Sequence, residues 1–137
     1  MLLRRVLAVP LVLALALPGA AAARGGGERE ELRLAGTCSR GASSELRLRA
    51  EDGTIRVEFR VDARRARERW RLVLVHERRV AWRGAGTTSS SSRSVRIRQE
   101  IPDYEGVDAV TARASGPRGA TCEATGVLTG THPSEDD

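Results

Sequence analysis

Lysine and asparagine are absent from this sequence, and aromatic residues are few. All 23 basic residues are arginine, and the 137 residues include one tyrosine, one phenylalanine and two tryptophans. This composition is typical of a GC-rich coding sequence, so the pI near 10.7 does not by itself indicate a selected basic surface. The length predicts one domain, and the scarcity of aromatic residues leaves little material to line a deep ligand cleft.

Residues for catalysis or metal binding are also scarce. The only imidazole bases are His76, expected to end a strand and there to cap it or face solvent, and His132, in the tail. The serines crowd into Ser89–Ser92 without the elbow motif of a serine hydrolase, and no HExxH, CxxC or EF-hand pattern occurs. Glu51 and Asp52 offer two carboxylates to calcium, but adjacent acids there are typical of a hairpin turn. We therefore expect no enzymatic activity, no metal and no cofactor.

The N-terminal residues have the three parts of a secretory signal peptide in the usual order. Arg4 and Arg5 form a basic start, an apolar run of 12 residues covers 6–17, and small residues continue to Ala23. The run is shorter than the ~20 residues of a membrane-spanning helix, and no second run of that length follows. We expect residues 1–23 to be a signal peptide and the product to be extracellular, without a membrane span.

Two polar segments flank the expected domain, which covers residues 32–130. Residues 24–31 have no apolar side chain to bury, which predicts a flexible N-terminal segment, and 131–137 form an acidic C-terminal tail. The cysteines, Cys38 and Cys122, would lie in an oxidising compartment. We therefore expect them to form a disulfide bond.

Short runs with period-2 alternation are separated by glycine, aspartate, proline and serine, which predicts antiparallel strands with one buried face. The clearest is 55–61, which follows a hairpin turn at Gly53, and 70–75 is apolar enough for a central strand. We expect loops at 62–68 and 84–92. The remaining strands are expected at 32–34 leading to Cys38, 46–50, 79–83, 95–101, 107–115 and 121–128.

Seven to eight short strands favour an all-β fold, an antiparallel immunoglobulin-like sandwich with one disulfide. Trp70 on a central strand suits this arrangement, as does a bond that ties the first strand to the last. Such a bond would not be the inter-sheet bridge of antibody domains. A small β-barrel is the alternative architecture.

Several short motifs, mostly turn and strand residues, are spread over residues 36–128. They are Cys38, Glu51-Asp52-Gly53-x-Ile55-x-Val57-Glu58, Val61-Asp62, Arg69-Trp70, Gly84, Ser94-x-x-x-Arg98, Gly106-x-Asp108-x-Val110-x-Ala112-x-Ala114 and Cys122. This set resembles small secreted actinobacterial proteins of unknown function, which have a signal peptide and one immunoglobulin-like β-sandwich. The resemblance implies an architecture but gives no information about activity. The segment 62–68 departs from the family pattern because it is rich in arginine rather than in asparagine and glycine.

Charge is segregated along the chain. Residues 32–130 contain 19 arginines and 12 acidic residues, a net charge of +7, whereas both tails are acidic. A surface of outward-facing arginines would attract polyanions, although Glu45, Glu58 and Glu100 interrupt it and aromatic stacking platforms are missing. Solvated arginines that discourage edge-to-edge aggregation are the other interpretation. The arginines that we expect to contact a polyanion are Arg47, Arg49, Arg56, Arg60, Arg69, Arg71, Arg96 and Arg98.

These patterns predict a secreted, non-catalytic binding or interaction domain. Its ligand is unknown from the sequence, and a cell-surface protein is one class of partner. The alternative is an extracellular polyanion-binding protein that uses the arginine-rich face of a sheet to hold an anionic polymer. Fold class alone does not decide between them.

Overall fold

The computed structural model describes residues 30–129. The predicted signal peptide, most of the predicted flexible segment and the acidic tail lie outside the described residues. Among these residues the structure contains no helix that could span a lipid bilayer.

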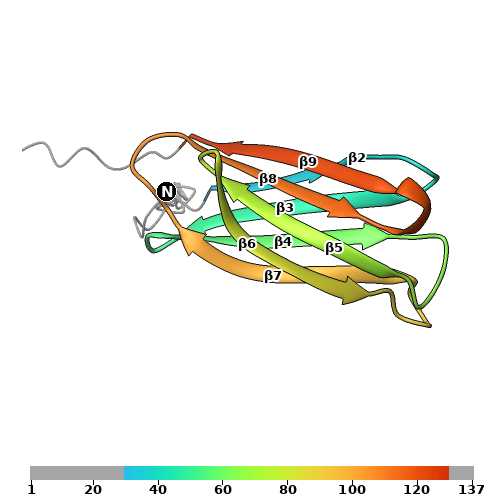
Figure 1. The fold of residues 1–137 in the computed structure, drawn as a ribbon. Helices are drawn as coiled ribbons and strands as arrows, with labels where there is room; N and C mark the ends of the chain where they lie inside the picture. Colours follow the sequence, from blue (N-terminus) through green and yellow to red (C-terminus); the bar gives the residue numbers. More distant parts are fainter. Residues whose placement is uncertain (1–29, 130–137) are drawn as a thin grey trace, which may run out of the picture.

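Residues 30–129 form nine strands in two antiparallel sheets that pack face to face (Figure 1). In order across the first sheet, the strands are β1 (Glu31–Ala35), β3 (Ser43–Glu51), β4 (Thr54–Asp62) and β7 (Ser94–Pro102). The second sheet consists of β2 (Thr37–Cys38), β9 (Thr121–Leu128), β8 (Asp108–Ser115), β5 (Arg69–His76) and β6 (Arg79–Thr87). A short 3-10 turn, Pro117–Gly119, connects β8 to β9. The predicted sandwich, rather than a closed barrel, is the observed architecture.

The inward residues of both sheets make one core. In β4 the predicted alternation is confirmed, because Ile55, Val57 and Phe59 are fully buried whereas Arg56 is exposed on the other side. Trp70 on β5 is 1% exposed, and β5 lies between β8 and β6, as the apolar run predicted. Burial of side chains of this size stabilises by roughly 1.5–3 kcal/mol each.

The first predicted strand is divided in two, which accounts for the count of nine. At Gly36 the chain leaves β1 in one sheet and enters β2 in the other. The Gly36 N–H donates to the Ser44 carbonyl. A Cβ at this position would lie 2.9 Å from the Glu123 carbonyl oxygen. Glycine is therefore the residue that lets the chain change sheets here.

The prediction placed the start of the loop 84–92 too early in the sequence. β6 continues through Gly84 and Gly86 to Thr87, and both glycines pair with β5. A Cβ at Gly84 would lie 2.3 Å from the ring of Trp82, which occupies that space. Composition suggested a loop because glycine weakens strands, but pairing with a central strand overrides that preference.

The predicted flexible segment also ends earlier than expected. Glu31 is the first residue of β1, and its carboxylate binds the Arg47 guanidinium at 2.7 Å. Glu30 accepts hydrogen bonds from the backbone N–H and the hydroxyl of Thr129. Pairing along β3 thus orders two charged residues that have no apolar surface to bury.

The predicted disulfide is confirmed. Cys38 and Cys122 lie opposite each other on the neighbouring strands β2 and β9 and are bonded across a sequence separation of 84. The bond lies within the second sheet, fastens the short strand β2 to the last strand and, as expected, is not the inter-sheet bridge of antibody domains.

Because the bond closes a long loop, the double variant Cys38→Ser/Cys122→Ser should lose about 4 kcal/mol of unfolding free energy. Urea unfolding followed by tryptophan fluorescence measures the loss. The parent protein unfolded in dithiothreitol is the control and should match the double variant. Equal midpoints for the parent with and without reductant would contradict the prediction.

Candidate functional site

The structure separates the eight arginines that the sequence grouped. Six of them lie on the outward side of the first sheet, on β3, β4 and β7. Arg69 and Arg71 instead lie on β5 in the second sheet, with exposed side chains on its outward side. The eight arginines therefore do not share one surface.

The outward side of the first sheet, here called the arginine face, is nearly balanced in charge. Its arginines are Arg33, Arg47, Arg49, Arg56, Arg60, Arg96 and Arg98, and its acids are Glu31, Glu45, Glu51, Glu58, Asp62 and Glu100. Each of the seven arginines has a carboxylate oxygen within 3.6 Å. Seven arginines against six acids leave a formal charge of +1.

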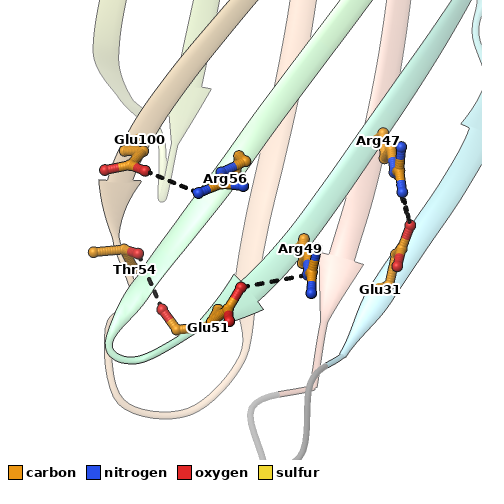
Figure 2. Close-up of polar contacts among 7 residues, drawn as sticks. All are labelled: Glu31, Arg47, Arg49, Glu51, Thr54, Arg56 and Glu100. Atoms are coloured by element: carbon orange, nitrogen blue, oxygen red, sulfur yellow. Dashed lines mark hydrogen bonds and ion pairs between the residues drawn. The ribbon is translucent and has the colours of Figure 1, made fainter.

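The strand register explains why acids are needed on this face. Three arginine pairs lie directly opposite each other on neighbouring strands, among them Arg49 with Arg56, and like charges at this spacing repel. Figure 2 shows how acids offset this repulsion: Arg49 forms an ion pair with Glu51, and Arg56 forms one with Glu100, both at 3.5 Å. Glu51 also accepts a hydrogen bond from Thr54 through its carbonyl, as in a hairpin turn.

Positive charge instead collects at one end of the sandwich, here called the arginine end. Four connections meet there, 39–42, 63–68, 88–93 and 116–120, at the right of Figure 1. They carry six arginines and one acid, a formal charge of +5. These residues are Arg40, Arg64, Arg65, Arg67, Arg93, Arg118 and Glu68.

The opposite end of the sandwich is acidic. Its connections are 52–53, 77–78 and 103–107, at the left of Figure 1. They carry four acids and one arginine, a formal charge of −3. The described domain is therefore electrically polar along its strands, which no prediction from the sequence anticipated.

A pocket of about 230 Å³ opens at the arginine end. Four arginines line it: Arg40, Arg64, Arg65 and Arg118. Arg118 donates to Glu68 Oε2 at 3.0 Å, whereas no carboxylate of residues 30–129 forms an ion pair with the other three. A hollow of about 320 Å³ on the arginine face is also lined by arginines, but each of those already has an acidic partner.

The wall of this pocket contains one of the two buried side-chain polar atoms without a hydrogen-bond partner in residues 30–129. Trp70 lines the pocket and is 1% exposed, and its Nε1 has no acceptor. An unsatisfied buried N–H costs roughly 1–3 kcal/mol. Such groups are rare in folded proteins, so each calls for an explanation such as strain, an ordered water or a bound ligand.

Thr88 fixes the arginine-rich loop 63–68 in place. Its side chain is 2% exposed; its hydroxyl donates to the Arg65 carbonyl at 2.8 Å and accepts from the Glu68 N–H at 2.9 Å. Its backbone exchanges two further hydrogen bonds with Arg67 and Glu68. The guanidiniums therefore project from a loop that is ordered before any ligand arrives.

Four arginines of this end have left-handed backbone conformations. Their φ angles are positive: Arg40 at 57°, Arg67 at 59°, Arg93 at 55° and Arg118 at 58°. This region costs an L-residue roughly 1–2 kcal/mol. Such residues cluster at ligand sites, where the fold holds them in place.

His76 was expected to end a strand and there to cap it or face solvent; it is the last residue of β5, as expected, but the solvent-facing alternative is wrong. It is 3% exposed, and its Nε2 lies 2.6 Å from Oδ1 of the fully buried Asp108. The ring of Tyr104 stacks on the imidazole with centroids 4.6 Å apart, and the Tyr104 N–H donates to the same carboxylate oxygen. The reason is the direction of the alternation, since His76 continues the inward phase of Trp70, Leu72 and Leu74.

Comparisons with known proteins add no name to this site. The chain matches no protein-family model, no curated protein and no solved structure. A function can therefore be inferred only from the residues of the chain and their geometry.

Replacing Thr88 by valine keeps its shape but removes both hydroxyl hydrogen bonds, so Thr88→Val should lower the unfolding free energy by about 2 kcal/mol. It should also speed amide hydrogen exchange at Glu68. Thr87→Val is the matched control, because Thr87 is the exposed neighbour on β6. If both variants have the same stability, Thr88 does not anchor the loop.

Proposed function

We propose that this protein is a secreted, non-catalytic binding domain that recognises an anionic ligand at its arginine end. One observation carries the proposal. The loops of this end carry six arginines and one acid, four of these arginines line a pocket, and three of the four have no carboxylate partner among residues 30–129. Guanidinium groups without acidic partners are available to an incoming anion.

The contrast with the arginine face supports placing the proposed site at the arginine end. A ligand on that face would have to displace Glu31, Glu58 or Glu100 from arginines that already bind them. At the arginine end, Arg40, Arg64 and Arg65 face no such competition within the described residues. The acidic opposite end would further orient an approaching polyanion toward the arginine end.

The side chains also indicate the chemistry of the ligand. Planar guanidinium groups bind phosphate, sulfate and carboxylate groups with two parallel N–H donors. A pocket of about 230 Å³ admits one such group, and neighbouring arginines outside it, Arg67 and Arg93, would contact adjacent groups of a polymer. We therefore infer an anionic polymer, with one charged group seated in the pocket.

Two further features support a binding role outside the cell. The disulfide and the predicted signal peptide fit an oxidising compartment. His76, the histidine within residues 30–129, is buried beneath Tyr104, so it is a poor candidate for a catalytic base. The resemblance to small secreted actinobacterial proteins remains a prediction.

Two matched triple variants test the location of the site. One carries Arg40→Gln, Arg64→Gln and Arg65→Gln at the arginine end, and the other carries Arg47→Gln, Arg49→Gln and Arg56→Gln on the arginine face. Both lose the same formal charge. Affinity for heparin and for inorganic polyphosphate, measured by titration calorimetry at low salt, should fall about 10- to 100-fold only in the first variant, since each lost contact is worth roughly 0.5–1 kcal/mol.

Three outcomes would contradict the proposal. The parent protein could bind neither polymer at low salt, or its binding could be unchanged in 0.5 M salt, where charge-driven binding weakens. Equal losses in the two triple variants would show that total charge, and not the arginine end, determines binding.

A further inference from the structure

The second buried polar atom without a partner lies at the opposite end of the sandwich. Asp108 is fully buried; its Oδ1 accepts hydrogen bonds from His76 and Tyr104, whereas Oδ2 has no partner among residues 30–129. Its location is also the acidic end of the molecule. A buried carboxylate oxygen left without a donor is costly, and a bound cation would remove the cost.

Two neighbours complete a set of possible ligands around this carboxylate. His76, Glu77 and Asp108 each offer one ligand atom, and these atoms all lie within 4.8 Å of one another. A metal ion with bonds of about 2.0–2.2 Å places its ligand atoms at most ~4 Å apart, so these atoms must approach one another by roughly 1 Å to bind one ion.

The fold holds these three residues in place from two distant segments. His76 is the last residue of β5, Glu77 begins the turn to β6, and Asp108 begins β8. Backbone hydrogen bonds join the segments: the Glu77 N–H donates to the Ala109 carbonyl, and the Ala109 N–H donates to Glu77 Oε1 at 2.7 Å. Glu77 itself has a positive φ of 51°, so its conformation is set by the turn.

We propose that His76, Glu77 and Asp108 bind a divalent transition-metal ion of the Zn²⁺ type. One imidazole nitrogen and two carboxylates are a ligand set that zinc accepts, with solvent in the remaining position. The exposed side chain of Glu77 leaves that position open to water. On binding, the ion takes the place of the hydrogen that links His76 Nε2 to Asp108 Oδ1: the neutral imidazole keeps its one ring proton on Nδ1, and Nε2 offers its lone pair to the ion.

The ligand types distinguish this ion from calcium or magnesium. Those cations prefer oxygen ligands only and take six or more of them. Nitrogen from His76 in a compact three-ligand set favours zinc instead. The surrounding charge of −3 at this end adds attraction for any cation, which the experiment must separate from specific binding.

The chain's single tyrosine gives a selective probe, because Tyr104 stacks on His76. The untagged full chain, labelled with 3-fluorotyrosine, has one expected ¹⁹F resonance. Titration with ZnCl₂ should shift this resonance and saturate at one ion per chain, and calorimetry should give the same stoichiometry. Absence of a shift at 1 mM Zn²⁺, or an equal shift with Ca²⁺ or Mg²⁺, would overturn the proposal.

Substitutions identify the ligands. Glu77→Gln, at an exposed position, should fold normally and weaken zinc binding at least tenfold, and Asp108→Asn should do the same where it folds. Glu105→Gln is the matched control, because Glu105 is an exposed acid of the same end. It should leave the affinity unchanged. Equal affinities in Glu77→Gln and the parent would refute the assignment.

A further control addresses the other histidine and the arginine end. His132→Ala should bind zinc like the parent, and loss of binding in that variant would place the ion in the acidic tail and overturn the site. The Arg40/Arg64/Arg65 triple variant should also bind zinc like the parent. These variants therefore test the zinc site and the anion site independently of each other.

Discussion

The two-residue period of the strands is the constraint on which the rest of this structure depends. Each strand must bury one side against the other sheet, and the core that results is built mainly from Trp70, Phe59 and aliphatic side chains. Arginine, which makes up all of the chain's basic residues, cannot enter that core. It is therefore confined to the outward sides of the sheets and to the connections at the two ends.

These two locations have different electrostatic requirements. On a sheet, opposite side chains have Cβ atoms ~5 Å apart, so pairs such as Arg33 with Arg47 need carboxylates beside them. The arginine face has them, and its charge is nearly neutral. The connections have no such regular spacing, because each loop can direct its side chains away from those of the neighbouring loop. Surplus positive charge is found in these connections at one end of the molecule, and also on the outward side of the second sheet, where Arg69, Arg71, Arg83 and Arg113 accompany a single acid, Glu123.

Each end then contains a buried polar group that has no hydrogen-bond partner among the residues the structure describes. Trp70 Nε1 lies beside the arginine pocket, and Asp108 Oδ2 lies beside His76 and Glu77. Both belong to strands of the second sheet, at or near the strand ends, where the core gives way to solvent. The proposed anion site and the proposed cation site therefore lie at opposite ends, separated by the length of the sandwich.

The strands were predictable where alternation was strong, as in Ile55–Val61, and the cysteine pairing followed from there being only two. The end of β6 was not predictable from the sequence, because Gly84 and Gly86 have weak strand preferences that only pairing with β5 overrides. At the candidate sites, the arginine-rich segment 62–68 was visible as a departure from a pattern. The sequence could not show that three other connections meet it.

What the sequence by itself determined is therefore local: which residues are buried on each strand, where turns fall, and that one disulfide forms. Tertiary structure alone decided which charges meet. His76 and Asp108 are 32 positions apart and touch because β5 and β8 are neighbours in the second sheet. Arg40 and Arg118 line one pocket because hairpins and sheet crossings return the chain to the same end. Charge interactions depend on distance in space, and distance in space depends on the order of strands, which the period of a single strand does not specify.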